Sequence, residues 1–125
     1  MALPLRDGAG RDLMRGDRVF VSDEHVFGIL TQIDCWGEDA ILHIEKGWAS
    51  TLIKRSAGMH CLEVFRSIKN YRDFKVGDGV DCEDIGYEFT GKILEIFSNG
   101  LARIKTGYLS SHAVLLSACK ILNAS

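Results

Sequence analysis

The sequence predicts an all-β fold made of two similar modules in tandem. Short apolar stretches alternate with a period of two, as in residues 40–45, where Ala40, Leu42 and Ile44 are separated by more polar or outward-facing positions. Helical periodicity is hard to find along the chain. Motifs in the first half also return in the same order in the second half, which is typical of an internal duplication. Alternation and repetition together set this fold class.

Four motifs carry the repeat. The first is a Gly-Asp-x-Val opening at 16–19 and 77–80, and the second is a Gly-x-[Ile/Leu]-x-x-Ile segment at 28–33 and 91–96. The third is an apolar strand followed by Gly and an aromatic residue at 41–50 and 101–110, and the fourth is a closing segment at 61–64 and 119–122. The spacing between motifs changes by only a few residues, as loop insertions and deletions produce. We therefore expect two modules with equivalent strands.

Local signals place bends and turns within each module. Apolar residues follow Gly28 and Gly91 at +2 and +5, which breaks strict alternation and predicts a β-bulge or a sharp bend that coils the strand. The segment 98–100, Ser-Asn-Gly, lies between two apolar runs and predicts a tight hairpin, with 36–39 as its longer equivalent. Segments 56–60 and 115–118 are each expected to form one helical turn before the last strand.

The expected architecture is two five-stranded modules packed together. We place the first module at residues 1–65, a basic connector at 66–76 and the second module at 77–125. Domains of about 55–65 residues can fold alone although they bury only about 60% of their unfolded-chain surface. Two modules of this size fit the chain of 125 residues.

Composition narrows the function classes. The chain is 46% hydrophobic with one proline and carries a net charge of −2, which favours a folded protein and is not typical of a dedicated nucleic-acid binder. Its apolar runs are too short to span a membrane, and its first sixteen residues lack the apolar core of a secretory signal. We expect a cytoplasmic protein with no membrane association. Its four cysteines form no C-x-x-C pair and are expected to be reduced, with Cys61 and Cys119 in matching core positions.

The order of these motifs resembles small SH3-like barrels, including the Tudor and KOW groups. The Gly-Asp-x-Val opening, the Gly-x-[Ile/Leu]-x-x-Ile strand, the next apolar strand with its Gly and the closing strand carry this resemblance twice, over nearly the whole chain. The resemblance implies two SH3-like barrels and a binding module. Members of this class bind proline-rich or methylated peptides, RNA or DNA, or the ribosome, so the resemblance leaves the ligand open.

Aromatic residues near strand ends are the first candidate ligand-binding residues. In Tudor-type barrels such residues build cages for cationic ligands through cation-π attraction. The competing interpretation is that they close the barrel ends or pack the modules together. Trp48 and Tyr108 are the strongest candidates because both follow a Gly at matching positions. The full set is Trp48, Tyr108, Phe27, Phe89, Trp36 and Phe97.

The basic connector supports an alternative function in RNA or DNA binding. Between residues 66 and 75 it has four cations against one carboxylate, a net charge of +3, together with a tyrosine. Cations mixed with an aromatic ring favour single-stranded nucleic acids, although solvated linkers have the same composition. The candidate residues are Arg66, Lys69, Tyr71, Arg72 and Lys75.

Motifs for metal, cofactor or catalytic sites are not recognised. His60 and Cys61 are adjacent, so their side chains would point to opposite faces of a strand, and no second pair at ligand spacing accompanies them. We therefore expect no metal, no cofactor and no enzymatic activity. The leading expectation is a non-enzymatic module that binds a protein or peptide segment. An enzyme assembled at an oligomer interface is a third interpretation, and the oligomeric state is left open.

Overall fold

The computed structural model describes residues 5–36, 39–47, 49–56 and 63–122, and it is all-β. All sheets are antiparallel, and the one helical element in the described residues is a short 3-10 turn, η1 (Leu116–Ala118). The chain divides into two compact units, Met1–Ser67 and Ile68–Ser125, which we call unit 1 and unit 2. The predicted fold class is thus confirmed at the level of an all-β protein.

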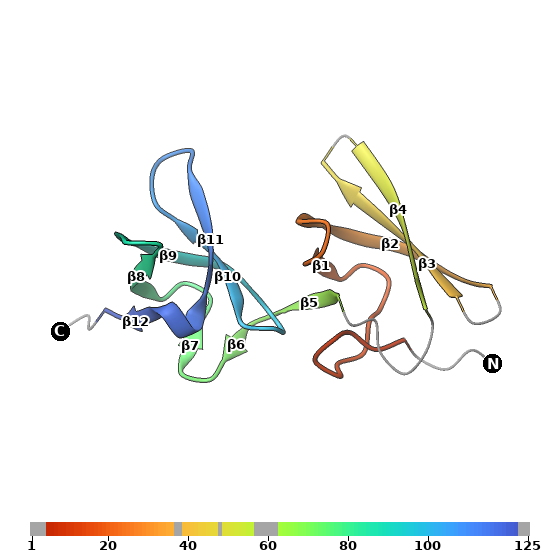
Figure 1. Ribbon diagram of the computed structural model, residues 1–125, viewed down its shortest axis with the longest axis horizontal. Coiled ribbons are helices and arrows are strands. Elements are labelled where there is room, and N and C mark those ends of the chain that lie inside the picture. Colours follow the sequence, from red (N-terminus) through yellow and green to blue (C-terminus); the bar gives the residue numbers. More distant parts are fainter. Residues whose placement is uncertain (1–4, 37–38, 48, 57–62, 123–125) are drawn as a thin grey trace. The chain divides into compact units, whose positions relative to one another are not determined.

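Unit 1 is an antiparallel sheet with the strand order β5-β1-β2-β3-β4 (Figure 1). Its strands are β1 (Arg18–Val21), β2 (Val26–Trp36), β3 (Asp39–Lys46), β4 (Ala49–Ser56) and β5 (Val64–Ile68). The apolar positions predicted to face inward in β3 are fully buried, because Ala40, Leu42 and Ile44 each have an exposed fraction of 0%. The alternation read from the sequence therefore marks the core side of this sheet.

Unit 2 repeats this arrangement with the order β12-β8-β9-β10-β11. Its elements are β6 (Asn70–Tyr71), β7 (Phe74–Lys75), β8 (Gly79–Asp84), β9 (Tyr87–Phe97), β10 (Leu101–Lys105), β11 (Ser111–Leu115), η1 and β12 (Cys119–Ile121). The helical turn expected at 115–118 is present as η1. The one expected at 56–60 lies mostly outside the described residues.

Neither sheet is closed by the strand pairings of the described residues. In unit 1, β1 to β4 form a continuous antiparallel ladder and β5 pairs with β1. In unit 2, β8 to β11 form the equivalent ladder and β12 pairs with β8. Between β4 and β5, and between β11 and β12, the described residues form no ladder. The two closed five-stranded barrels expected from the sequence are therefore not seen as closed sheets.

The opening motif forms the same turn in both units. The Asp17 carboxylate accepts a hydrogen bond from the Met14 backbone N–H at 2.8 Å, and Asp78 accepts one from Lys75 at 3.0 Å. The glycine before each aspartate has a positive φ, 98° in unit 1 and 97° in unit 2, which a residue with a Cβ adopts only with strain. The Gly-Asp pair is thus required by the turn that begins each sheet.

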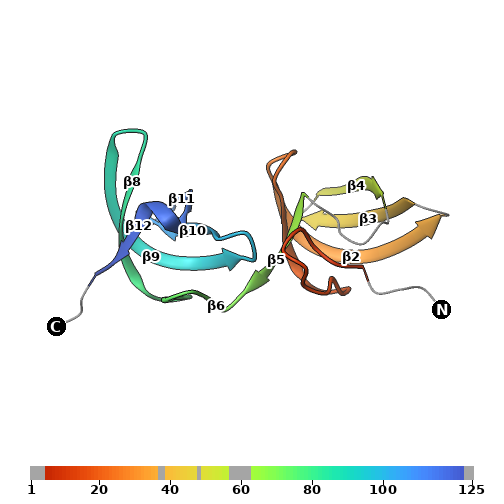
Figure 2. The same ribbon diagram turned by 60° about the horizontal axis from the view of Figure 1, so that its bottom comes forward.

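The predicted bulge is confirmed in both long strands. In β2 the register shifts between Leu30 and Gln32, and in β9 the equivalent shift falls opposite the Arg103/Ile104 step of β10. Figure 2 shows that β2 and β9 both curve along their length. The glycine just before each bulge permits this curvature, because a Cβ built on Gly28 would lie only 2.5 Å from Ile44 Cγ2.

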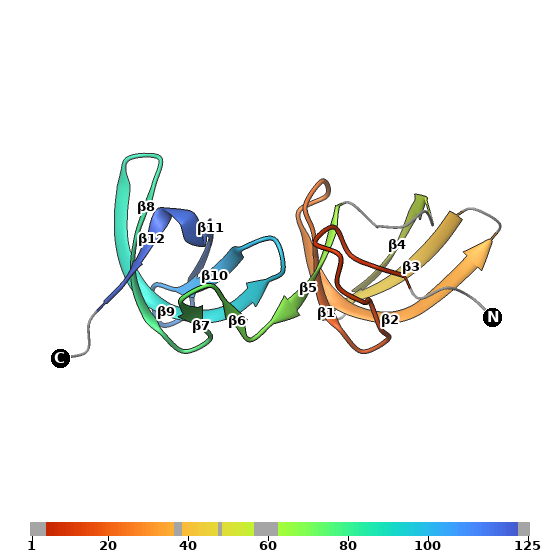
Figure 3. The ribbon, with the colours of Figure 1, turned by 90° about the horizontal axis from the view of Figure 1, so that it is seen from below.

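The segment expected as a connector belongs to the units themselves. The boundary falls between Ser67 and Ile68, and the short β6–β7 hairpin leads into β8 (Figure 3). Ile68, Tyr71 and Phe74 pack against the core of unit 2. Unit 1 has a counterpart before β1, where Arg6 and Asp12 form an isolated bridge. The repeat therefore begins before the Gly-Asp motif.

The pairing of the closing strands shows that the predicted match of Cys61 with Cys119 is wrong. Val64 pairs with Val21 across β5 and β1, and Cys119 pairs with Cys82 across β12 and β8. Val21 and Cys82 occupy equivalent positions two residues after the first Val of the opening motif. Val64 is therefore the structural equivalent of Cys119, in place of Cys61, which lies outside the described residues.

Each unit has its own apolar core. The core of unit 1 gathers Leu5, Leu13, Val19, Val21, Leu30, Ala40, Leu42, Ile44, Ile53 and Val64. The core of unit 2 gathers Val80, Cys82, Ile93, Ile96, Ala102, Ile104, Val114, Leu116, Cys119 and the partly buried residues of the β6–β7 hairpin. Burial of these side chains is the main favourable term for folding each unit.

Candidate binding surface

Four large apolar side chains of unit 2 are almost entirely exposed. The exposed fractions are 96% for Ile85, 77% for Tyr87, 90% for Tyr108 and 94% for Leu109. Ile85 lies in the β8–β9 turn and Tyr87 begins β9, whereas Tyr108 and Leu109 lie in the loop that joins β10 to β11. We call these four residues the turn surface. Exposed apolar groups that lie close together are typical of interaction sites, whereas scattered single ones need no explanation.

The β8–β9 turn holds Ile85 away from the core. Asp84 pairs with Tyr87, and the two residues between them have positive φ angles, 48° at Ile85 and 79° at Gly86. Two residues with positive φ between paired strand ends are the geometry of a tight two-residue hairpin. Such a turn fixes the backbone, so the Ile85 and Tyr87 side chains are presented from a defined position.

One contact ties the β8–β9 turn to the start of β11. His112 Nε2 lies 3.0 Å from Asp84 Oδ2, and the His112 ring lies 4.7 Å from the Phe89 ring, centroid to centroid. Asp84 precedes Ile85 directly, and His112 follows the loop that contains Tyr108 and Leu109. The contact therefore brings together the bases of the two connections that form the turn surface.

The six predicted ligand-binding residues have different environments. Tyr108 is exposed and belongs to the turn surface. Phe89 is partly buried against the core of unit 2, Phe27 stacks on the buried Phe20 with ring centroids 4.6 Å apart, and Phe97 is completely buried. Phe97 is therefore closed to a ligand, whereas Phe27 and Phe89 keep part of their surface exposed. The Trp36 side chain and all of Trp48 lie outside the described residues.

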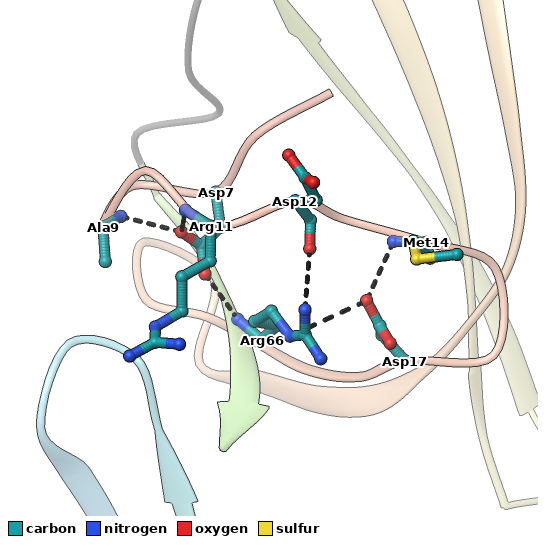
Figure 4. A network of polar contacts seen from close by, with 7 residues as sticks. All are labelled: Asp7, Ala9, Arg11, Asp12, Met14, Asp17 and Arg66. Carbon is teal, nitrogen blue, oxygen red and sulfur yellow. Dashed lines mark hydrogen bonds and ion pairs between the residues drawn. The ribbon is translucent and has the colours of Figure 1, made fainter. Parts of the chain in front are cut away.

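Of the predicted nucleic-acid residues, Arg66 is engaged within unit 1. Figure 4 shows its contacts with the segment before β1. Its backbone N–H donates to Asp7 Oδ2 at 3.0 Å, and Nη1 donates to the Asp12 carbonyl at 3.2 Å. Its Nε also lies 4.0 Å from Asp17 Oδ2. Arg66 thus joins β5 to the opening of the unit.

Asp7 is the buried centre of that network. Its exposed fraction is 0%, and its carboxylate accepts hydrogen bonds from the backbone N–H groups of Ala9 and Arg11, both at 2.9 Å, in addition to that of Arg66. A buried carboxylate is tolerated when it is hydrogen-bonded in this way. These hydrogen bonds stabilise the first loop and explain why a carboxylate is buried at position 7.

The remaining basic residues lie on or beside the β6–β7 hairpin. Lys69, Arg72 and Lys75 are exposed. The Tyr71 ring is partly buried against the core of unit 2, and the Arg72 guanidinium carbon lies 5.3 Å from its centroid. The structure therefore brings four of the five predicted residues together, with Tyr71 held in place by packing.

Two cysteines of unit 2 face each other in the sheet. Cys82 and Cys119 are direct partners across β8 and β12, with exposed fractions of 2% and 8%. Burial is the main cause that raises the pKa of both thiols. The interaction between the two thiols raises the pKa of Cys82 further and partly offsets the rise at Cys119. Both thiols are therefore largely protonated near neutral pH.

Two further kinds of feature are absent from the described residues. They contain no group of three or more His, Cys, Asp or Glu side chains placed to hold a metal ion. Nor do they contain a helix with the length and apolar character needed to cross a membrane. Comparisons with protein-family models, curated protein sequences and solved structures returned no match for the chain.

Sequence reasoning missed three of the four residues of the turn surface. It selected aromatic residues near strand ends and so found Tyr108 but not Tyr87, and it did not consider Ile85 or Leu109. A usable signal was present, since Ile85 stands beside Gly86 in the middle of a polar turn, where a large aliphatic side chain has no local packing partner. Apolar residues in turns next to glycine deserve the same scrutiny as aromatic ones.

Proposed function

We propose that the chain is a non-enzymatic cytoplasmic protein made of two SH3-like units, and that it binds a protein segment through the turn surface. The observation that carries this proposal is the near-complete exposure of Ile85, Tyr87, Tyr108 and Leu109 on two connected turns. Large apolar and aromatic side chains are the usual energetic centres of protein interfaces.

The shared strand order supports the SH3-like assignment. Counted from the strand that follows the opening turn, both units have the order fifth-first-second-third-fourth, with the same bulge in the long second strand. A glycine and a bulge in the second strand coil a sheet enough to close a small barrel. The assignment of each unit to this class remains our proposal.

Local charge favours a protein over a nucleic acid at the turn surface. Between residues 80 and 91 the chain has four carboxylates, Asp81, Glu83, Asp84 and Glu88, and neither lysine nor arginine. Carboxylates repel phosphate groups, whereas nucleic-acid affinity depends on neutralising phosphates with cations. A protein segment with apolar side chains and some basic character fits this surface.

The test replaces all four residues of the turn surface with serine and compares co-purification from a cell lysate. The matched control replaces Met14 and Leu52 with serine as well, and these two side chains of unit 1 are 63% and 64% exposed. We expect both variants to keep the wild-type melting temperature, and only the turn-surface variant to lose its bound protein. Equal retention of the same partner by both variants would contradict the proposal.

A second candidate function is nucleic-acid binding at the β6–β7 hairpin. The exposure of Lys69, Arg72 and Lys75 on one short hairpin favours it. Fluorescence anisotropy with labelled single-stranded RNA, single-stranded DNA and duplex DNA tests it at low and near-physiological salt. Binding that weakens steeply with salt and is lost on replacing these three cations with glutamate would support this function. Salt-independent or absent binding would exclude it.

A further inference from the structure

The pairing of Cys82 with Cys119 has consequences beyond packing. The two residues are direct register partners in the antiparallel β8–β12 pair. Cα atoms of directly opposed residues in such a pair are about 4.5–5.5 Å apart. Disulfides form when Cα atoms are about 4.4–6.8 Å apart. The backbone therefore already satisfies the spacing that a disulfide needs.

The thiols also point to the same side of the sheet. Cys82 and Cys119 are register partners, and both belong to the buried core of unit 2. Cys119 additionally donates a hydrogen bond to the Leu115 carbonyl, with a sulfur–oxygen distance of 3.7 Å. Their side chains thus meet without any change of strand register.

A shallow depression beside η1 gives access to Cys119. It is lined by Glu83, Ile85, Ser117, Ala118, Cys119 and Lys120. Cys119 is also the more exposed of the two cysteines, at 8% against 2% for Cys82. Cys119 is therefore the cysteine that a small disulfide reagent in this depression meets first.

We propose that Cys82 and Cys119 are a reversible modification site, which a small-molecule disulfide oxidises to a cross-strand disulfide that clamps β12 onto β8. The Cys119 thiolate attacks one sulfur of the oxidant, which breaks the S–S bond of the oxidant and releases one thiol. The Cys82 thiolate then attacks Cys119 Sγ in the mixed disulfide and releases the second thiol. The two cysteine protons and two electrons end on the two released thiols, so the exchange balances.

The effect of a Cys82–Cys119 disulfide on stability follows from its position in unit 2. The bond would link β8 to β12 and enclose residues 82–119, which include the turn surface. A link of this kind lowers the entropy of the unfolded chain and so stabilises the folded unit. Because both thiols are buried and mostly protonated, the reaction is slow and depends on transient opening of the short β12 strand. This inference is independent of the proposed protein-binding function.

The test equilibrates the full chain with oxidised and reduced glutathione, then blocks free thiols under denaturing conditions and maps the tryptic peptides. We expect peptide 76–92 linked to peptide 106–120, reversal by dithiothreitol, and a melting temperature raised by about 5 °C or more in the oxidised protein. A Cys119→Ala variant should lose both the link and the shift. A Cys35→Ser/Cys61→Ser variant should keep both. Free thiols at 82 and 119 at equilibrium, links to other cysteines, or a lowered melting temperature would overturn the proposal.

Discussion

The Tyr71 ring lies directly against Gly100. A Cβ placed on Gly100 would be 2.8 Å from Tyr71 Cζ and 2.9 Å from its hydroxyl oxygen. Gly100 ends the turn between β9 and β10 with a φ of +87°. The contact joins the β6–β7 hairpin to the sheet of unit 2 and explains why this basic, polar segment folds onto a core.

We expect Gly100→Ala to destabilise the protein by about 2–4 kcal/mol, from the left-handed backbone and the clash with Tyr71. Gly86→Ala is the matched control, because Gly86 has a φ of +79° and nothing within 4 Å of a built Cβ. It should cost only about 1 kcal/mol. Urea unfolding measured by circular dichroism compares the two. Equal losses would show that Tyr71 does not restrict this position.

A second prediction concerns the glycines before the two bulges. A Cβ on Gly28 would lie 2.6 Å from the Glu45 carbonyl oxygen, and one on Gly91 would clash with the Lys105 carbonyl oxygen. Because backbone atoms cannot move aside cheaply, either Gly→Ala variant should lose about 2 kcal/mol or more. Gly79→Ala, whose nearest contact would be 3.9 Å away, should unfold at nearly the wild-type urea concentration. Tolerance at 28 or 91 would refute the bulge geometry.

The third prediction tests the buried carboxylate of Asp7. Asp7→Ala would leave three backbone N–H groups without this acceptor and should destabilise the protein by about 3 kcal/mol. Asp12→Ala is the control, because its side chain is 59% exposed and lies 3.7 Å from Arg6 in a surface ion pair worth at most about 1 kcal/mol. Both tryptophans precede Ser67, so tryptophan fluorescence during urea unfolding follows unit 1.

The fourth prediction concerns the pKa of Asp34, which lies below its ordinary value of 3.8. The hydrogen bond from Gln32 is the largest cause, followed by that from His43 at 2.8 Å. A lowered folded-state pKa means that the charged carboxylate adds stability above the unfolded pKa and that this stability is lost as the pH falls through the folded pKa. NMR titration should show that Gln32→Ala and His43→Ala each raise this pKa. An unchanged pKa in either variant would contradict the assignment.

The parts of the fold that follow from local sequence could be predicted. The bulge after Gly28, the Ser-Asn-Gly turn that ends at Gly100, and the turn made by Asp17 each depend on residues next to one another. The charges of residues 66–76 predict a solvated connector, whereas the structure has the β6–β7 hairpin there, with Tyr71 and Phe74 packed against the core of unit 2. The repeated Arg-Asp-[Leu/Phe] that precedes the opening motif at 11–13 and 72–74 would have shown that this segment belongs to the repeat.

The candidate site could be predicted only in part, because exposure depends on tertiary packing. Phe97 and Tyr108 both stand near a strand end in the sequence, yet one is fully buried and the other is 90% exposed. The pairing of Cys82 with Cys119 does not follow from the repeat, because loops of different length shift the match between the two closing strands. A pattern in sequence locates a strand end, but it does not tell which side of the sheet its side chain will occupy there.

The central claim, that unit 2 binds a protein through the turn surface, is tested most directly by photo-cross-linking in living cells. A photoreactive phenylalanine analogue replaces Tyr108 or Tyr87, and the control chain carries it at Leu52, which is exposed in unit 1. We predict one protease-sensitive adduct shared by positions 87 and 108 and missing at 52. The same adducts at all three positions, or adducts at 87 and 108 that nuclease removes and protease leaves, would contradict the account.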